Sequence, residues 1–248
     1  HKGNFFKSRN LLSLDFTELP LTDSLYEASG IIAKAEENIK KLYNSKRSII
    51  SCGGNTLCIQ TMFRLAAGNG GDVLCDRVIH RSAVSAMALL DINPVWIRRN
   101  FGKESLLAEK IDLKSLEKQL SNNNSFKAFY TTSPSYHGIL QDIKKISDLC
   151  DVHSVPVMVD NAHGSHLMFT SKNLHPIANG ASLCADSAHK TLPVLTGGAW
   201  LHINDDKFVK NAKSAMALFG STSPSYPTMA SMDICLSWLW DYAEKEFL

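Results

Sequence analysis

The chain has 248 residues, which is enough for one large domain or two small ones, and its ordinary apolar content allows a sizeable core. Its formal net charge is +2 with no basic block, so it lacks the electrostatic footprint of a nucleic-acid or membrane binder, and no apolar run approaches the length of a membrane span. The six cysteines form no C-x-x-C pair, which favours reduced thiols in a cytoplasmic protein over a disulfide framework or a zinc site.

Apolar periodicity and turn residues predict that helices and strands alternate along the chain. In the first half we expect helices over residues 30–44, from the turn at 53–56 to about 67, and over 81–90, with strands over 48–52, 72–75 and 94–98. In the second half we expect helices capped by Asp112 and Asp142, a helix over 205–218, a last helix containing Trp238 and Trp240, and strands over 126–131, 155–159, 181–185 and 199–203.

This alternation predicts an α/β fold in which a mostly parallel sheet is covered by helices on both faces. The almost unbroken apolar run at 155–159 is typical of a parallel strand that is buried on both faces. No internal repeat or low-complexity linker divides the chain. Because it begins with His1 rather than Met and its last helix reaches Leu248 without a cap, we expect it to be a piece of a longer protein.

The segment DSAHKTLP, at residues 186–193, holds Lys190 between two apolar runs. A lysine buried between strands is costly unless it is neutralised or used covalently, and a Schiff base with pyridoxal 5′-phosphate (PLP) would use it. Ser187 and His189 would supply donors for the phosphate. The alternative is a solvated lysine in a connecting loop.

A glycine-rich turn at residues 53–56 joins an expected strand to a helix. The amides of Gly54 and Asn55 and the hydroxyl of Thr56 are suited to hold a phosphate at the helix N-terminus, where the dipole favours anions. An ordinary capped helix start is the alternative.

Asp160 directly follows the buried strand at 155–159, so its carboxylate needs a cationic partner. A protonated pyridine nitrogen is one candidate, and a neighbouring arginine or a helix cap is the alternative. His163 and His166 follow at i, i+3 spacing, but no third ligand accompanies them, so we expect no metal site.

Two further polar loops follow expected strands. In the first, at residues 76–82, His80 could stack on a flat cofactor or serve as a hydrogen-bonded structural residue. The second, at 131–138, is rich in hydroxyl groups, but the G-x-S-x-G elbow of a serine hydrolase is absent. Ligands of open α/β sheets gather where strands end. A phosphate turn, a stacking histidine, a buried aspartate and a lysine, each at a strand end, are the four parts of a PLP site.

The sequence resembles the Orn/Lys/Arg decarboxylase family of PLP enzymes, which has the aspartate-aminotransferase-like fold (fold type I). The resemblance runs nearly from end to end. It is carried by His1-Lys2-Gly3, DFTEL (15–19), DRVIHRS (76–82), TSPSYHG (132–138), VDNAHGSH (159–166), SAHKTL (187–192), STSPSY (221–226) and MASMD (229–233).

The resemblance implies a role for each of these positions. Lys190 would hold PLP covalently, Asp160 would pair with the ring nitrogen, and His80 and Ala162 would lie against opposite ring faces. The remaining residues expected to bind the cofactor, chiefly at its phosphate, are Gly54, Asn55, Thr56, His163, Ser187 and His189. Ser221 or Thr222 would reach the phosphate of a partner subunit, because family sites form at a dimer interface.

Two positions depart from the family pattern. Asn161 stands where a glutamate is common, and Asn55 stands where a small hydroxyl residue is usual. The resemblance implies a single PLP-binding large domain over residues 1–248, with an N-terminal arm over about 1–25 and without the family's C-terminal domain.

The expected activity is decarboxylation of lysine, arginine or ornithine by a cytoplasmic homodimer or larger homo-oligomer that binds neither nucleic acid nor membrane. The alternatives are a PLP-dependent transaminase or lyase of the same fold and a catalytically silent dimerisation partner.

Overall fold

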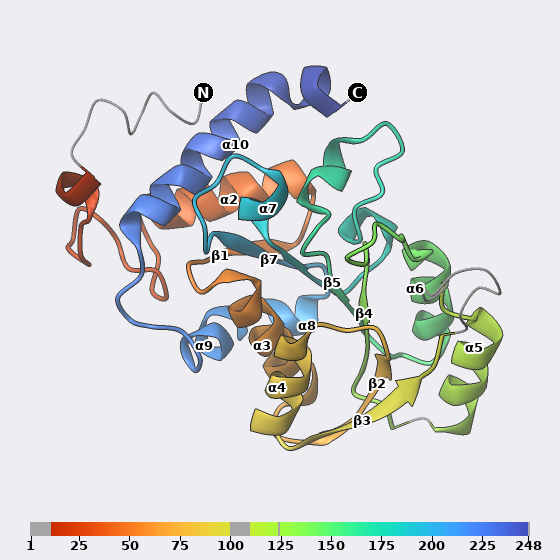
Figure 1. Cartoon of the computed structure of the whole chain (residues 1–248). Helices are drawn as coiled ribbons and strands as arrows, with labels where there is room; N and C mark the ends of the chain where they lie inside the picture. Colours follow the sequence, from red (N-terminus) through yellow and green to blue (C-terminus); the bar gives the residue numbers. More distant parts are fainter. Residues whose placement is uncertain (1–10, 100–109, 124, 248) are drawn as a thin grey trace.

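A mixed sheet forms the centre of the computed structural model, which describes residues 11–99, 110–123 and 125–247. Within these residues the sheet has seven strands in the order β1-β7-β6-β5-β4-β2-β3 (Figure 1). The strands are β1 (Arg47–Ser51), β2 (Gly71–Asp76), β3 (Ile92–Ile97), β4 (Ala128–Thr132), β5 (Val157–Asp160), β6 (Leu183–Asp186) and β7 (Ala199–Ile203).

The sheet is parallel except at β7, which runs antiparallel to both of its neighbours, β1 and β6. The expectation of a mostly parallel sheet is therefore confirmed. Strands β2, β4, β5 and β6 point the same way, so their carboxyl ends lie along one edge of the sheet. The residues that follow these ends include the polar loops described above. Strand β1 points the same way, because β1 and β6 both run antiparallel to β7, so the turn after β1 lies at this edge as well.

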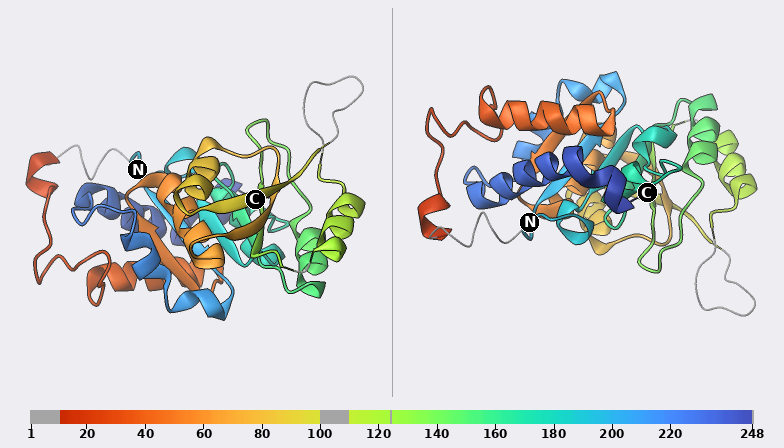
Figure 2. Two further views of the ribbon diagram at one scale, coloured as in Figure 1. Left: turned by 90° about the horizontal axis from the view of Figure 1, so that it is seen from below. Right: turned by 90° about the horizontal axis from the view of Figure 1, so that it is seen from above.

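Helices cover both faces of the sheet, as the alternation predicted (Figures 1 and 2). Side chains of alternate strand residues face opposite sides. Ile49, for example, packs in the cluster with α3 (Gly54–Ala67), α4 (Arg81–Leu89), α8 (Asp206–Val209) and α9 (Ala212–Ala217), whereas Ile50 packs with α2 (Ile31–Tyr43) and α10 (Tyr226–Phe247). At the β3 side, Leu74 packs with α5 (Leu113–Asn122) and α6 (Ile143–Val152).

The shorter elements complete the description. They are α7 (Ala188–Thr191) and the 3₁₀ turns η1 (Leu11–Leu14), η2 (Ser165–Phe169) and η3 (Ile177–Asn179). All six cysteines are free thiols, and five of them are buried, which agrees with the expectation of core thiols. Among the described residues, no helix combines the length and apolar character needed to cross a bilayer.

The prediction of one helix over residues 205–218 is wrong in one respect, because the structure has two helices there, α8 and α9. The guanidinium of Arg47 donates a hydrogen bond to the carbonyl of Val209 at 2.5 Å. In one continuous helix that carbonyl would instead accept from the backbone N–H of Lys213. A tertiary contact that sequence periodicity does not reveal thus accompanies the break.

A buried ion pair connects α2, β1 and α9. The ammonium of Lys213 contacts Glu36 Oε1 at 2.5 Å and the carbonyl of Leu25 at 2.5 Å, and Glu36 also accepts from the backbone N–H of Ile50 at 2.9 Å. Both charged side chains are buried. Burial raises the pKa of Glu36 and lowers that of Lys213, while the attraction between the two groups opposes both changes.

We predict that Glu36→Gln lowers the free energy of unfolding by about 3 kcal/mol, because it leaves the buried ammonium of Lys213 without its counter-charge. Urea unfolding measures the change. Asp206→Asn is the matched control, since Asp206 pairs with Lys46 on the surface and such a pair contributes about 1 kcal/mol or less. Equal losses in the two variants would contradict the prediction.

Candidate active site

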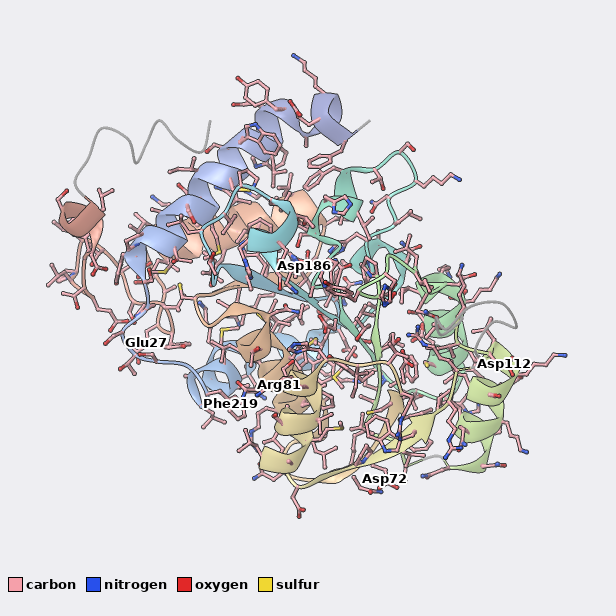
Figure 3. All side chains as sticks on the ribbon, viewed as in Figure 1. Glu27, Asp72, Arg81, Asp112, Asp186 and Phe219 are labelled. Atoms are coloured by element: carbon pink, nitrogen blue, oxygen red, sulfur yellow. The ribbon has the colours of Figure 1, made fainter. Side chains whose placement is uncertain are left out.

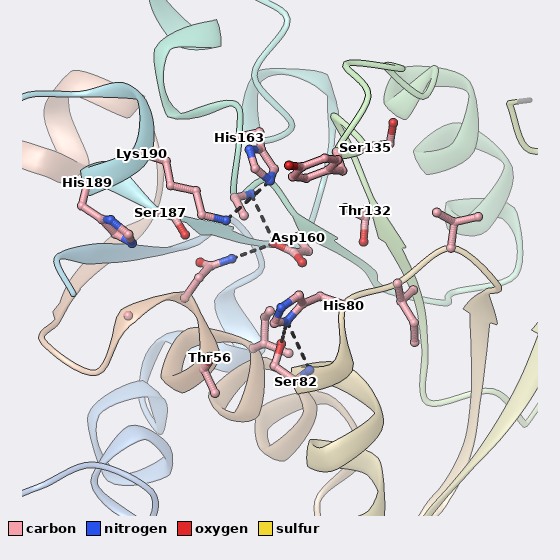
Figure 4. Close-up of a pocket in the computed structure, with 17 residues that line it drawn as sticks. Thr56, His80, Ser82, Thr132, Ser135, Asp160, His163, Ser187, His189 and Lys190 are labelled. Carbon is pink, nitrogen blue, oxygen red and sulfur yellow. Dashed lines mark hydrogen bonds between the residues drawn. The ribbon is translucent and has the colours of Figure 1, made fainter. Parts of the chain in front are cut away.

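Ten of the twelve residues expected to form the site line a single cavity of about 450 Å³ at the carboxyl edge of the sheet (Figure 4). These ten are Gly54, Asn55, Thr56, His80, Asp160, Ala162, His163, Ser187, His189 and Lys190. They come from the segments after β1, β2, β5 and β6, which are distant in sequence. The sheet therefore brings together most of the groups that the sequence indicated separately.

Asp160 ends β5 and is the buried acid of this cavity, with 2% of its surface exposed. Its Oδ1 accepts hydrogen bonds from Asn55 Nδ2 at 2.7 Å and from the backbone N–H of Ala162 at 3.2 Å. Burial raises the pKa of Asp160 to about 6, and the nearby positive charge of Lys190 opposes that rise. A cationic ligand atom at Asp160 would relieve the cost of this burial.

The side chain of Asn55 points to Asp160, whereas it was expected at the phosphate. The amide nitrogen of Asn55 can donate to this carboxylate, and it stands one bond farther from the backbone than the hydroxyl of a serine or threonine would. The departure from the family pattern at Asn55 thus coincides with a contact at the acid end of the cavity. The backbone N–H of Asn55 remains in the first turn of α3, where an anion could still bind it.

The N-terminus of α3 lies at the cavity and is suited to an anion. Gly53 occupies its N-cap position and makes no side-chain cap, so the alternative of an ordinary capped helix start is not observed. Gly54 has φ +66°, a left-handed conformation that glycine adopts without strain. Thr56 follows within the first turn. The N–H of Gly54 donates to the carbonyl of Gly197 at 2.9 Å, so the N–H groups of Asn55 and Thr56, together with the helix dipole, are the ones suited to a phosphate.

Lys190 lies on α7 and is exposed, which corrects the expectation that it is buried between two strands. On this short helix Ala188 packs in the core, whereas the Lys190 side chain lines the cavity. Its Nζ lies 3.5 Å from Nε2 of His163. An exposed lysine carries little desolvation cost, so burial is not what would make it reactive.

His80 is the N-cap residue of α4 as well as a wall of the cavity. Its Nδ1 accepts from the backbone N–H of Ser82 at 3.2 Å and lies 2.8 Å from the Ser82 hydroxyl. Burial lowers the pKa of His80, with a smaller contribution from Lys190, so the ring favours the neutral form. The structural role is thus observed, and it fixes the orientation of a flat ring that borders the cavity.

Asp76, the last residue of β2, forms contacts that hold the loop carrying His80. This fully buried carboxylate forms an ion pair with Arg99 through two contacts, one of them Nε to Oδ1 at 2.9 Å. It also accepts from the Thr131 hydroxyl at 2.8 Å and from the backbone N–H of Val78 at 3.1 Å. Sequence reasoning placed Asp76 in a motif without assigning it this positioning role.

Ser221 and Thr222 are exposed and do not line the cavity. Ser221 borders a separate pocket of about 300 Å³ that Gly53 and Thr56 also line. Their contact with the phosphate of a partner subunit therefore stays a prediction.

The cavity also has walls that sequence reasoning did not single out as site residues. The aromatic ring of Tyr136 is exposed at the cavity and meets His163 edge-on, with ring centroids 5.9 Å apart. The other additional lining residues are Ile59, Val78, Ile79, Ser82, Thr132 and Ser135. Most of them belong to the polar loops at residues 76–82 and 131–138. Their position directly after an expected strand was the feature of the sequence that could have marked them as site residues.

Residues 2–248 match the family model described as "Orn/Lys/Arg decarboxylase, major domain". The chain belongs to the Orn/Lys/Arg decarboxylase family. This confirms the resemblance drawn from the motifs, and PLP is the cofactor on which this family depends.

Curated relatives of the family cover most of this chain but extend well beyond it. The chain is 31% identical over 241 residues to the uncharacterized protein YaaO of Bacillus subtilis, covering 96% of the chain and 50% of that protein. It is 30% identical to an arginine decarboxylase of Halalkalibacterium halodurans, over 92% of the chain and 47% of that enzyme. The chain thus spans about half the length of these relatives.

Solved structures show the same fold. The constitutive lysine decarboxylase of Escherichia coli aligns with a TM-score of 0.79 at 24% identity, covering 96% of this chain and 35% of that one. A serine palmitoyltransferase of Sphingomonas wittichii aligns with a TM-score of 0.70 at 17% identity, covering 90% and 54%. The expected fold type I architecture is therefore confirmed.

We predict that Asp160→Asn stabilises the protein at neutral pH. In the folded chain the pKa of Asp160 is about 6, against an ordinary value of 3.8, so folding favours the protonated acid. This contribution to stability is complete below pH 3.8 and is lost as the pH rises to about 6. The variant cannot ionise, and should gain at most about 3 kcal/mol at neutral pH and almost nothing below about pH 4.

Denaturant unfolding of both proteins across this pH range measures the effect. A difference in stability that does not change with pH would contradict the assignment of a raised pKa to Asp160.

Proposed function

We propose that this chain binds PLP in the cavity at the carboxyl edge of the sheet and, in its full-length protein, decarboxylates a basic amino acid. The observation that carries the proposal is that Lys190 and Asp160, an exposed amine and a buried acid, line the same cavity in a member of the Orn/Lys/Arg decarboxylase family. Relatives named arginine decarboxylase and lysine decarboxylase support the substrate class.

The residues of the cavity fit PLP at each part of the cofactor. Lys190 would hold its aldehyde carbon, and Asp160 would face its ring nitrogen. The uncapped N-terminus of α3, with Ser187 and His189 nearby, would hold its phosphate. When bound, PLP supplies a conjugated ring that accepts the electron pair released at the substrate's α-carbon.

The protein's own residues would orient and tune that ring. The ionised carboxylate of Asp160 would stabilise a positive charge on the ring nitrogen and so would favour the protonated ring, and this pairing would offset the cost of burying Asp160. His80 and Ala162 line the cavity and would restrict the ring to one plane. His163 lies 3.5 Å from the Lys190 amine, and because burial lowers the pKa of His163, its ring is neutral and can accept a hydrogen bond from that amine.

We predict that borohydride reduction of the PLP-treated protein fixes a pyridoxyl group on Lys190 and that Lys190→Ala abolishes both this label and the visible absorbance of the bound cofactor. Peptide mass mapping locates the label. Lys172→Ala is the matched control, because Lys172 is an exposed lysine outside the cavity. A label that persists in Lys190→Ala would mean that another amine holds the cofactor.

We predict that the full-length protein releases CO₂ from arginine, lysine or ornithine only when PLP is present. A screen with carboxyl-labelled amino acids measures this directly. Amine formation without a keto-acid acceptor would separate decarboxylation from transamination. PLP binding without CO₂ release from any of the three would favour the catalytically silent alternative.

A further inference from the structure

A further buried carboxylate, Asp186, lies at the end of β6 in the interior of the domain and does not line the cavity (Figure 3). Its Oδ2 is 3.0 Å from Nε2 of His175 and 3.4 Å from Nε2 of His202, and its Oδ1 accepts from Asn161 Nδ2 at 2.7 Å. All four side chains are fully buried. The proposed function gives this cluster no role, although Asp186 directly precedes Ser187.

The cluster has the composition of a metal site, since one ligand atom from each of His175, Asp186 and His202 lies within 4.8 Å of the others. The hydrogen bond on the far side of His175 argues against that use. There, Nδ1 accepts from the backbone N–H of Ile177 at 3.3 Å, so the ring proton is on Nε2. A protonated Nε2 donates to Asp186 and cannot ligate a metal.

The cluster is anchored on the side away from the cavity. His202 lies on β7, and its Nδ1 is 2.8 Å from the Ser48 hydroxyl of β1. Its ring stacks on that of Tyr43, with centroids 4.3 Å apart, and Tyr43 belongs to α2. Asp186 is therefore connected to two strands and a helix that are themselves part of the core.

On the other side, Asp186 holds the turn that follows β5. Asn161, whose side chain donates to Asp186, is the residue directly after Asp160. Its backbone N–H donates to Ala185 of β6 at 2.9 Å, and its carbonyl accepts from Gly164 at 2.9 Å. A Cβ on Gly164 would lie only 2.0 Å from Asn161 Oδ1, so this turn closes tightly around the Asn161 amide.

We propose that Asp186, held by His175 and His202, is a positioning residue that fixes the turn carrying Asp160, Ala162 and His163 at the cofactor cavity. The proposal rests on the proposed function for its biological purpose. Asn161 is the link between the two aspartates, which explains in physical terms why an amide is useful here: a glutamate at this position would bring a second carboxylate against Asp186.

The charge of Asp186 also acts on Asp160. It is one of the causes that raise the pKa of Asp160, together with burial, whereas Lys190, Asn55 and the N–H of Ala162 lower it. Further titratable groups that interact with Asp160 are the hydroxyl of Tyr130 and the thiols of Cys58 and Cys184. Asp186 therefore has two separable effects on the cavity, one on the position of the turn and one on the proton affinity of Asp160.

Asp186→Asn tests both effects in the full chain, and Gly164→Ala tests the position alone because it displaces Asn161 without changing a charge. We expect both variants to bind PLP about tenfold more weakly, the loss that follows when one hydrogen bond to a charged group is removed. The same loss should appear with pyridoxine 5′-phosphate, which has no aldehyde and so does not report on Lys190. Unchanged affinity in both variants would overturn the proposal.

Carbon-13 NMR of labelled aspartate in the protein without PLP supplies a readout that a merely structural role would not move. The Asp160 carboxyl signal is assigned with Asp160→Asn, and its titration midpoint should fall in Asp186→Asn. An unchanged midpoint would overturn the electrostatic part. Glu36→Gln is the matched control, since it breaks another buried ion pair and should leave both the midpoint and the affinity unchanged.

These outcomes separate the inference from the proposed function. If the unaltered chain binds neither PLP nor pyridoxine 5′-phosphate, the proposed function fails, while the NMR midpoint still tests whether Asp186 acts on Asp160. If the unaltered chain binds both and the variants bind equally well, the proposed function stands and Asp186 is a structural residue only.

Discussion

The need to compensate buried carboxylates governs the carboxyl edge of this sheet. Three parallel strands, β2, β5 and β6, each end in a buried aspartate, at Asp76, Asp160 and Asp186. An ionised carboxylate removed from water is costly unless charges or hydrogen bonds replace the lost hydration. The way in which each of the three carboxylates is compensated determines which of them can bind a ligand at this edge of the sheet.

Two of these aspartates are compensated within the protein. Asp76 is paired with Arg99, and Asp186 accepts hydrogen bonds from His175 and Asn161 and lies 3.4 Å from Nε2 of His202. Asp160, between them in the sheet, accepts from two neutral donors among the described residues, and it is the one that faces the cavity. The arrangement leaves the middle acid available to a cationic group and uses its two neighbours to hold the surrounding loops.

Much of the fold and the cavity could be predicted from the sequence, because both depend on local patterns. Apolar runs located the strands, and polar residues at their ends located the site, as with Asp160 and Lys190. The predictions failed where a long-range contact decides the outcome. Neither the direction of the Asn55 side chain nor the break between α8 and α9 follows from any spacing in the chain.

The cluster around Asp186 illustrates the same limit. His175, Asp186 and His202 are separated by 11 and 16 residues, and each is unremarkable in its own segment. Only the pairing of β6 with β7 brings His202 next to the end of β6, where Cys184 is its partner in register. Sequence reasoning considered a metal at His163 and His166, which are neighbours in the chain, because proximity in sequence was the only proximity available.

The antiparallel strand β7 has a consequence for Lys190. Because β6 and β7 are adjacent and hydrogen-bonded, the segment between them returns to the sheet, and α7 within it is joined to the start of β7 by a hydrogen bond from the N–H of His189 to the carbonyl of Gly198. This hydrogen bond holds the backbone next to the lysine against the start of β7. The Lys190 amine can then approach a bound molecule by rotation about its own side-chain bonds. The residues on the opposite walls of the cavity have to hold that molecule within the distance that the lysine side chain spans.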